Sequence, residues 1–186
     1  MTEYFENKGK ENTERTLQLA YERAQELGIK ELALATTTGR TAYKALEICK
    51  DMKIVAVSYH AGFKGSFKLS MDQETIDDLK EKGASVVCAT HALSGVERGL
   101  SKKHPGPYPV LMIADVLRLF GSGTKVAIEV MIMAVDSGSL SGERMISVGG
   151  SSKGCDTALV LTPVCQSDFF DMKIHEIICK PNRYNE

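Results

Sequence analysis

The sequence predicts an α/β fold, with three layers (α/β/α) around a mostly parallel, doubly wound sheet and an antiparallel strand pair near the C-terminus. Three short apolar runs alternate with amphipathic helical segments in the first half of the chain. This alternation is typical of parallel strands joined by helical crossovers. Three further strand-like runs follow near the end with short connections. Because parallel strands need longer crossovers, at least one of these later pairs is expected to be antiparallel.

The first crossover begins with a helix from Glu11 to Leu27, in which apolar residues recur at helical spacing. Gly28 follows as a residue that ends helices. A buried strand at 32–35, a polar turn at 36–41 and a second helix at 41–50 come next. Together these segments predict one strand–turn–helix unit.

The pattern then repeats. Residues 54–57 form the second predicted strand, and a loop covers 58–71. Asp72 is expected to cap the next helix and Gly83 to close it. The third predicted strand covers 86–89.

The second half of the chain is organised differently. Residues 90–109 are polar and rich in glycine and proline, and no element is predicted there. Acidic residues of the later helices, Glu129 among them, are expected to be solvated or to cap helix ends. No linker interrupts the pattern, so residues 1–186 are expected to form a single domain. The later elements are helices at 109–120 and 124–135 and strands at 145–148, 157–162 and 172–179.

Composition narrows the class of protein. The 186 residues carry a net charge of −1, so no basic excess points to a nucleic acid partner. No apolar run approaches the roughly 20 residues of a membrane span, and the polar first dozen residues do not form a signal peptide. Five cysteines without a C-x-x-C pair are expected to be reduced thiols, with no metal site. We therefore expect a cytoplasmic protein without a membrane partner.

The polar turn after the first strand is the best candidate for a ligand site. Backbone N–H groups at a helix start are unpaired and carry partial positive charge, which suits a phosphate group. Four threonine hydroxyls add donors, a glycine allows close approach, and an arginine offers a cation. The alternative is that the threonines merely cap the helix. The candidate residues are Thr36, Thr37, Thr38, Gly39, Arg40 and Thr41.

Other candidates follow neighbouring strands and are expected at the same sheet edge, where α/β proteins bind ligands. Tyr59, His60, Gly62 and Phe63 follow the second strand, and His91 follows the third. A histidine there can serve as a general acid or base, or simply as a hydrogen-bonded structural residue. The aromatic rings, with Phe67, can stack on a flat ligand or form a small satellite core.

A second glycine-rich turn, beginning at Gly149 and Gly150, follows the strand at 145–148. It can cradle another part of the ligand. It can equally be a plain connection between strands.

Several runs resemble a known family. Residues 16–58, with E-L-G-I-K, T-T-T-G-R-T-A and V-A-V-S, resemble the C-terminal domain of pyruvate kinase. The runs S-Y-H-A-G-F at 58–63, A-T-H-A-L-S-G-V-E-R-G at 89–99 and V-G-G-S-S-K-G-C-D-T-A at 148–158 resemble small stand-alone archaeal and bacterial proteins of that fold. The runs I-A-D-V-L-R at 113–118 and E-I-I-C-K-P at 176–181 extend this resemblance.

The resemblance implies flavin mononucleotide (FMN) as a ligand, with its phosphate on the 36–41 turn and its ring near His60, Phe63 and His91. Kinase chemistry on pyruvate is not expected, because these 186 residues show no resemblance to the pyruvate kinase barrel. The leading hypothesis is therefore binding of a phosphorylated small molecule. The alternatives are an enzyme with His91 or His60 as acid or base, and an effector-sensing module that forms a homo-oligomer.

Overall fold

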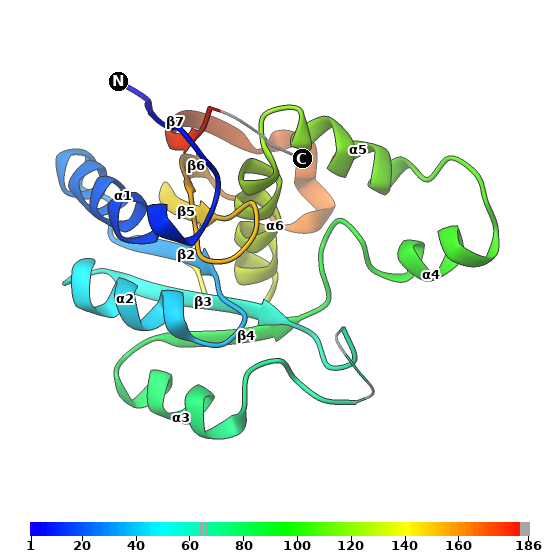
Figure 1. Cartoon of the computed structure of the whole chain (residues 1–186), viewed down its shortest axis with the longest axis horizontal. Helices are drawn as coiled ribbons and strands as arrows, with labels where there is room; N and C mark the ends of the chain where they lie inside the picture. The colour runs from blue at the N-terminus through cyan, green and yellow to red at the C-terminus, as the bar shows by residue number, and fades with distance from the viewer. Residues whose placement is uncertain (64, 66, 183–186) are drawn as a thin grey trace.

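Seven strands form one mixed sheet in the order β1-β7-β6-β5-β2-β3-β4 (Figure 1). The structure is a computed structural model that describes residues 1–63, 65 and 67–182. β5, β2, β3 and β4 are mutually parallel, whereas β6 runs antiparallel to both of its neighbours. The predicted α/β fold is thereby confirmed. The strands are β1 (Glu3–Phe5), β2 (Glu31–Ala35), β3 (Lys53–Tyr59), β4 (Ser85–Ala89), β5 (Met145–Gly149), β6 (Thr157–Thr162) and β7 (Lys173–Pro181).

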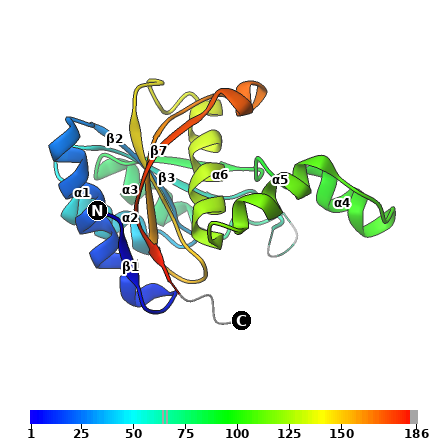
Figure 2. The same ribbon diagram turned by 90° about the horizontal axis from the view of Figure 1, so that it is seen from above.

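Helices cover both faces of the sheet (Figure 2). On one face lie α1 (Thr13–Leu27), α2 (Arg40–Ile48) and α3 (Gln73–Glu81). On the other face lies α6 (Ser122–Asp136), which packs mainly against β2 and β5. Each face has its own buried apolar cluster between helices and sheet, which accounts for the three layers. None of the helices in the described residues is long and apolar enough to cross a membrane.

The local helix signals are confirmed. Gly28 ends α1 in the left-handed conformation, with a φ of 67°. The Asp72 carboxylate accepts a hydrogen bond from the Thr75 N–H at 2.7 Å and so caps α3. Both signals depend only on neighbouring residues, so a single sequence suffices to predict them.

Two elements were not predicted. β1 pairs with β7 at the far end of the chain, and its three residues have no apolar alternation of their own. The expectation of no element over 90–109 is wrong, because α4 (Val96–Lys103) lies within it. α4 buries none of its residues, so it lacks the apolar stripe that identifies a packed helix. Two short 3-10 helices, at Lys10–Asn12 and Gln166–Asp171, complete the fold.

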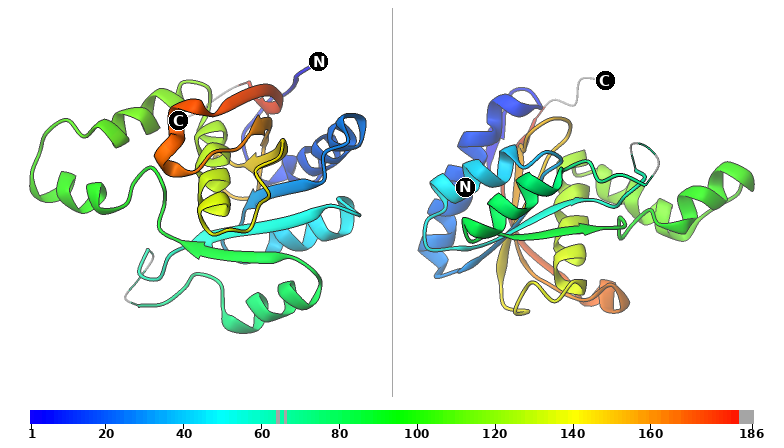
Figure 3. Two further views of the ribbon diagram at one scale, coloured as in Figure 1. Left: turned by 180° about the vertical axis from the view of Figure 1, so that it is seen from behind. Right: turned by 90° about the horizontal axis from the view of Figure 1, so that it is seen from below.

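α4 and α5 (Pro109–Arg118) extend away from the sheet, and Figure 3 shows them from behind and from below. We call residues 96–120 the α4–α5 arm. The arm connects the carboxyl end of β4 to α6, which then leads back to β5.

Candidate functional site

The order of the strands creates a switch point at the carboxyl ends of β2 and β5. From β2 the chain moves outward to β3 and β4, and after α6 it returns to β5 on the other side of β2. In open α/β sheets, ligands bind where the strand order reverses in this way, outside the carboxyl ends of the strands. The turn over 36–41 follows β2, and Gly149 ends β5. Tertiary structure therefore brings two of the predicted segments to one point.

The Thr36–Thr41 turn presents its threonines without using them as caps. Gly39 is the N-cap residue of α2, and no side chain makes a capping hydrogen bond there. Among the described residues, none of the four threonine hydroxyls has a hydrogen-bond partner. The geometry therefore does not favour the alternative that these threonines only cap the helix.

The main chain of this turn is firmly placed. The Thr36 N–H donates to the Val57 carbonyl at 2.9 Å, which extends the pairing of β2 with β3 by one residue. Thr36 and Thr41 are buried, whereas Thr38 and Arg40 are exposed. The turn thus ends at the first turn of α2, whose amide groups carry the positive end of the helix dipole.

Gly39 has a packing role that the sequence did not reveal. Its φ of 84° lies in the left-handed region, and an added Cβ would lie 2.7 Å from Cγ2 of Thr75 on α3. Gly39 therefore lets α2 begin close to α3. A side chain at this position would disturb the fold, so Thr38 is the better residue to replace in a binding test.

Four rings meet beyond the ends of β3 and β4. We call Tyr59, His60, Phe63 and His91 the ring cluster. The Phe63 centroid lies 4.3 Å from that of Tyr59 and 4.7 Å from that of His91. His60 meets both Phe63 and His91 edge-on, at 5.7 Å and 5.9 Å. The sequence predicts these rings at one edge of the sheet, and the structure brings them into contact.

The loop after β3 folds back to build this cluster. Gly62 has a φ of 87°, and its N–H donates to the Lys68 carbonyl at 3.1 Å. Phe67, which was expected to join the aromatic group, is 96% exposed and contacts no other ring among the described residues. The Arg98 guanidinium from α4 lies over the Phe63 ring at 5.0 Å, a contact that the sequence did not predict.

Three buried polar atoms at this edge lack hydrogen-bond partners among the described residues. They are Oγ of Ser58 and Nδ1 of His60 and His91. An unmet buried hydrogen bond costs about 1–3 kcal/mol, so three of them at one edge of the sheet are unusual. Polar atoms of a bound ligand would satisfy them.

A buried ion pair lies behind the ring cluster. Lys125 and Glu129 pair one helical turn apart on α6, with side chains 7% and 3% exposed. The other Glu129 oxygen accepts the Leu93 N–H at 3.0 Å, which ties the loop holding His91 to α6. The expectation that Glu129 is solvated is therefore wrong. The only sequence signal was a lysine and a glutamate four residues apart at the start of an otherwise apolar helix.

Gly149 and Gly150 allow close packing within the chain. A Cβ on Gly149 would lie 2.2 Å from the Gly123 carbonyl oxygen on α6, and one on Gly150 would lie 2.2 Å from the Gly154 carbonyl oxygen. The Asp156 carboxylate, also at this turn, accepts hydrogen bonds from the Ser151 and Gly9 N–H groups. Close packing within the chain thus explains why glycine stands at both positions. That Gly149 and Gly150 contact a ligand stays a prediction.

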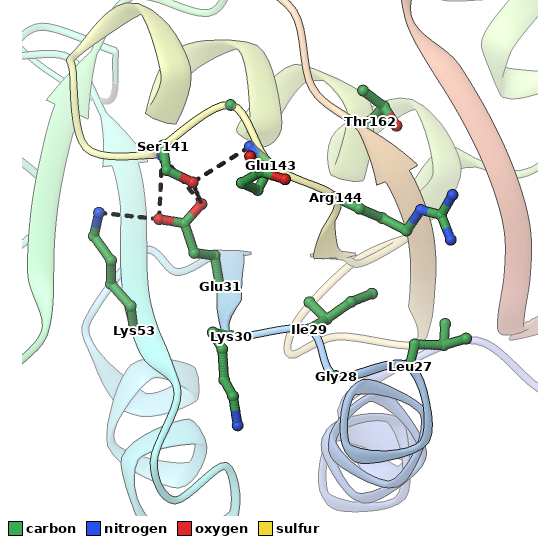
Figure 4. A pocket seen from close by; sticks show the side chains of 11 residues that line it. Leu27, Gly28, Ile29, Lys30, Glu31, Lys53, Ser141, Glu143, Arg144 and Thr162 are labelled. Carbon is green, nitrogen blue, oxygen red and sulfur yellow. Dashed lines mark hydrogen bonds and ion pairs between the residues drawn. The ribbon is translucent and has the colours of Figure 1, made fainter.

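A hollow of about 720 Å³ lies at the opposite, amino-terminal edge of the sheet (Figure 4). It is lined by residues such as Glu31, Lys53, Ser141 and Arg144. The Glu31 carboxylate already accepts the Ser141 N–H and hydroxyl and pairs with Lys53 at 3.1 Å. None of the predicted ligand residues lines this hollow, and its buried carboxylate is satisfied within the chain.

A match to a protein-family model identifies the family of this chain. The model of the pyruvate kinase alpha/beta domain matches residues 14–161. The chain belongs to the pyruvate kinase alpha/beta domain family. The matched range holds both the Thr36–Thr41 turn and the ring cluster. The family resemblance of the sequence is thereby confirmed, whereas a stand-alone archaeal or bacterial origin stays a prediction.

Solved structures similar to this pyruvate kinase alpha/beta domain include three of pyruvate kinase from Cryptosporidium parvum, one of them in complex with ADP. All three are 16% identical to it, with TM-scores of 0.40, 0.38 and 0.37. The matches cover 89%, 89% and 92% of this chain but only 22%, 23% and 23% of those chains. The domain thus spans less than a quarter of the length of these enzymes.

The described residues of this pyruvate kinase alpha/beta domain contain no group of three or more histidine, cysteine or acidic side chains placed to hold a metal ion. The five cysteines are free thiols, and burial raises the pKa of Cys49 to about 12.

The burial of His91 makes the stability of this pyruvate kinase alpha/beta domain depend on pH. Burial lowers its pKa, Lys125 and Arg98 lower it further, and only Glu129 opposes them. The folded state therefore binds fewer protons at His91 than the unfolded state does, and stability falls as the pH drops through the usual histidine range. We expect the free energy of unfolding, measured by urea denaturation, to fall less between pH 7.5 and about 5.5 in His91→Gln. Parallel curves for the two proteins would contradict this effect.

Proposed function

We propose that this domain binds a phosphorylated small molecule at the carboxyl edge of its sheet, with the phosphate on the Thr36–Thr41 turn. One observation carries the proposal: four threonine hydroxyls without partners among the described residues stand at the start of α2, beside the switch point. Hydroxyls and helix-start amides are the donors that phosphate oxygens accept from. The turn needs none of these hydroxyls to cap its helix, and the side chains of Thr37 and Thr38 are the accessible ones, so these two are the first that a ligand would meet.

FMN is the ligand we propose. Its flat ring would lie beside the ring cluster, where aromatic faces and Arg98 favour stacking. The buried atoms without partners, on Ser58, His60 and His91, suit the nitrogen and carbonyl groups along the edge of a flavin ring. These residues fit the group. FMN, when bound, supplies hydride and electron transfer, and the chain's own residues bind and orient it.

A titration with matched ligands tests this proposal. We expect FMN to bind with a Kd about 100-fold lower than riboflavin, which lacks the phosphate. Two charge-assisted hydrogen bonds at roughly 1.5 kcal/mol each account for this ratio. Quenching of flavin fluorescence by the purified protein measures both dissociation constants. Competition by ADP tests whether the site accepts a phosphorylated ligand with a different ring. Equal affinity for FMN and riboflavin would show that the turn does not bind the phosphate, and the proposal would fail.

Catalysis by His91 or His60 stays a prediction. Each ring keeps an unpartnered buried Nδ1 in the described structure, and burial favours neutral His91, the form that accepts a proton. A role as acid or base requires one of these nitrogens within hydrogen-bond reach of the bound ligand. A structure with FMN bound measures that distance directly.

A further inference from the structure

Lys125 is a buried cation whose role the proposed function leaves open. Its side chain is 7% exposed and lies near the start of α6, a helix whose buried residues are mostly apolar. Removing a charged group from water is costly, and well-packed apolar residues are often as stable as a buried ion pair. Stability alone therefore does not account for a lysine at this position. Buried charges of this kind are typical of sites that bind or react.

The two members of the ion pair differ in how completely the chain satisfies them. Glu129 uses both carboxylate oxygens, one for the Lys125 ammonium and one for the Leu93 N–H at 3.0 Å. The ammonium has three N–H donors, and among the described residues it makes one hydrogen bond, to Glu129. Two donors of Lys125 thus have no acceptor in the described chain. Like the three buried atoms without partners at this edge, they would be satisfied by polar atoms of a ligand.

Lys125 lies where the two parts of the candidate site meet. The first turn of α6 packs against Gly149, which ends β5 at the switch point. One turn further along α6, Glu129 accepts the Leu93 N–H and so fixes the loop that carries His91. Besides burial, which lowers the pKa of His91, the charges of Glu129 and Lys125 act on this ring, in agreement with this placement. A ligand that reaches from the switch point to the ring cluster therefore passes close to Lys125.

The charges around Lys125 leave a positive excess. Burial lowers the pKa of Lys125, Arg118 and Arg98 lower it further, and Glu129 opposes them. Glu129 balances Lys125 and Asp115 balances Arg118, so the excess comes from Arg98, which also lies over one ring of the cluster. A positive excess favours a ligand group that carries negative charge. It adds to the N–H donors of Lys125 in attracting an electron-rich oxygen.

We propose that Lys125 donates to a ring oxygen of the bound flavin and makes the site prefer the reduced ring; this inference rests on the proposed function. A reduced flavin ring is an anion at about pH 8, with its charge on the end that carries the carbonyl oxygens. An ammonium group in a buried site attracts such a charge more strongly than it does in water. Lys125 would thus determine which form of the ring binds, whereas the Thr36–Thr41 turn binds the phosphate of either form.

A neutral pair distinguishes this role from a purely structural one. The double variant Lys125→Gln/Glu129→Gln removes both charges, and the amide at position 129 still accepts the Leu93 N–H. Amides four residues apart on a helix can also bond each other, so the link between α6 and the loop of His91 remains. If Lys125 serves only to neutralise Glu129, the double variant binds both forms of the ring as the wild type does.

Titration of the whole chain with oxidised and with reduced FMN, without oxygen and at about pH 8, measures the preference. We expect the wild type to bind reduced FMN at least about 10-fold more tightly than oxidised FMN. By the two-electron relation, the potential of bound FMN then lies at least about 30 mV above that of free FMN. In the double variant the preference should disappear. A wild type without the preference, or a double variant that keeps it, overturns the inference.

Lys53→Gln/Glu31→Gln is the matched control. Lys53 and Glu31 form a similar pair at the opposite edge of the sheet, because the Glu31 carboxylate also accepts a backbone N–H, that of Ser141. Removing these two charges should leave the preference for reduced FMN unchanged. Circular dichroism checks that both double variants are folded.

Thr38→Glu separates a failure of this inference from a failure of the proposed function. The phosphate is the same in both forms of FMN, so this change should weaken the binding of both by the same factor and leave the preference intact. Equal affinity for FMN and riboflavin contradicts the phosphate site, and the ratio of reduced to oxidised affinity still tests Lys125. A protein that binds neither flavin overturns both proposals.

Discussion

The Thr38→Glu variant is expected to bind FMN about 1,000-fold more weakly than the wild type does. Thr38 is exposed in the Thr36–Thr41 turn, so a carboxylate there would lie beside the proposed phosphate. Two like charges about 4 Å apart near a protein surface repel by about 4 kcal/mol, which corresponds to this ratio. Fluorescence titration measures the affinity. The Thr38 side chain has no hydrogen-bond partner among the described residues, so the domain should remain folded.

Gln166→Glu is the control for this variant. It adds the same charge at an exposed position, where the Gln166 N–H donates to Asp136 at the C-terminal end of α6. That end lies at the opposite edge of the sheet, so FMN affinity should not change. If Thr38→Glu instead binds FMN as the wild type does, the phosphate lies elsewhere and the proposed function fails.

The second large effect is expected from Gly149→Ala, which should lower the free energy of unfolding by about 3 kcal/mol or more. The added Cβ would lie 2.2 Å from the Gly123 carbonyl oxygen and 2.5 Å from the Ala127 nitrogen. These are backbone atoms of a packed helix, so they cannot rotate away. Overpacking of this kind forces α6 away from β5. Urea denaturation followed by circular dichroism measures the loss.

Gly106→Ala is the matched control for this change. An added Cβ at Gly106 would meet nothing within 4 Å, and the residue is exposed in the arm. Its stability should therefore match the wild type or rise slightly. A Gly149→Ala protein of normal stability that has lost FMN affinity would place Gly149 against the ligand instead of α6.

Gly149 also shows which features of the site the sequence can predict and which it cannot. Gly149 and Gly150 were predicted beside the ligand because they form a glycine-rich turn after a strand. The structure places them at the predicted edge of the sheet, but the backbone that approaches them most closely belongs to the chain itself. A glycine shows that something comes near, and the sequence does not say what.

Local chemistry determined much of this protein before any fold was known. The strands at β2, β3 and β4, the Asp72 cap and the turn after β2 each depend on residues within a few positions of one another. Hydrophobic periodicity and capping act over that range, so the sequence predicts them. The ring cluster joins residues about 30 positions apart, and it was predictable for another reason: β3 and β4 are parallel, so the residues that follow them lie at one edge of the sheet.

Only the tertiary structure decided which distant segments meet. It placed β5 beside β2, which makes the switch point, and it paired β1 with β7 across the whole chain. It also buried Lys125 and Glu129, and it left α4 without a buried residue. The physical reason is the same in each case. Strand order and burial result from packing all the elements together, and no local pattern records which surface each of them will meet.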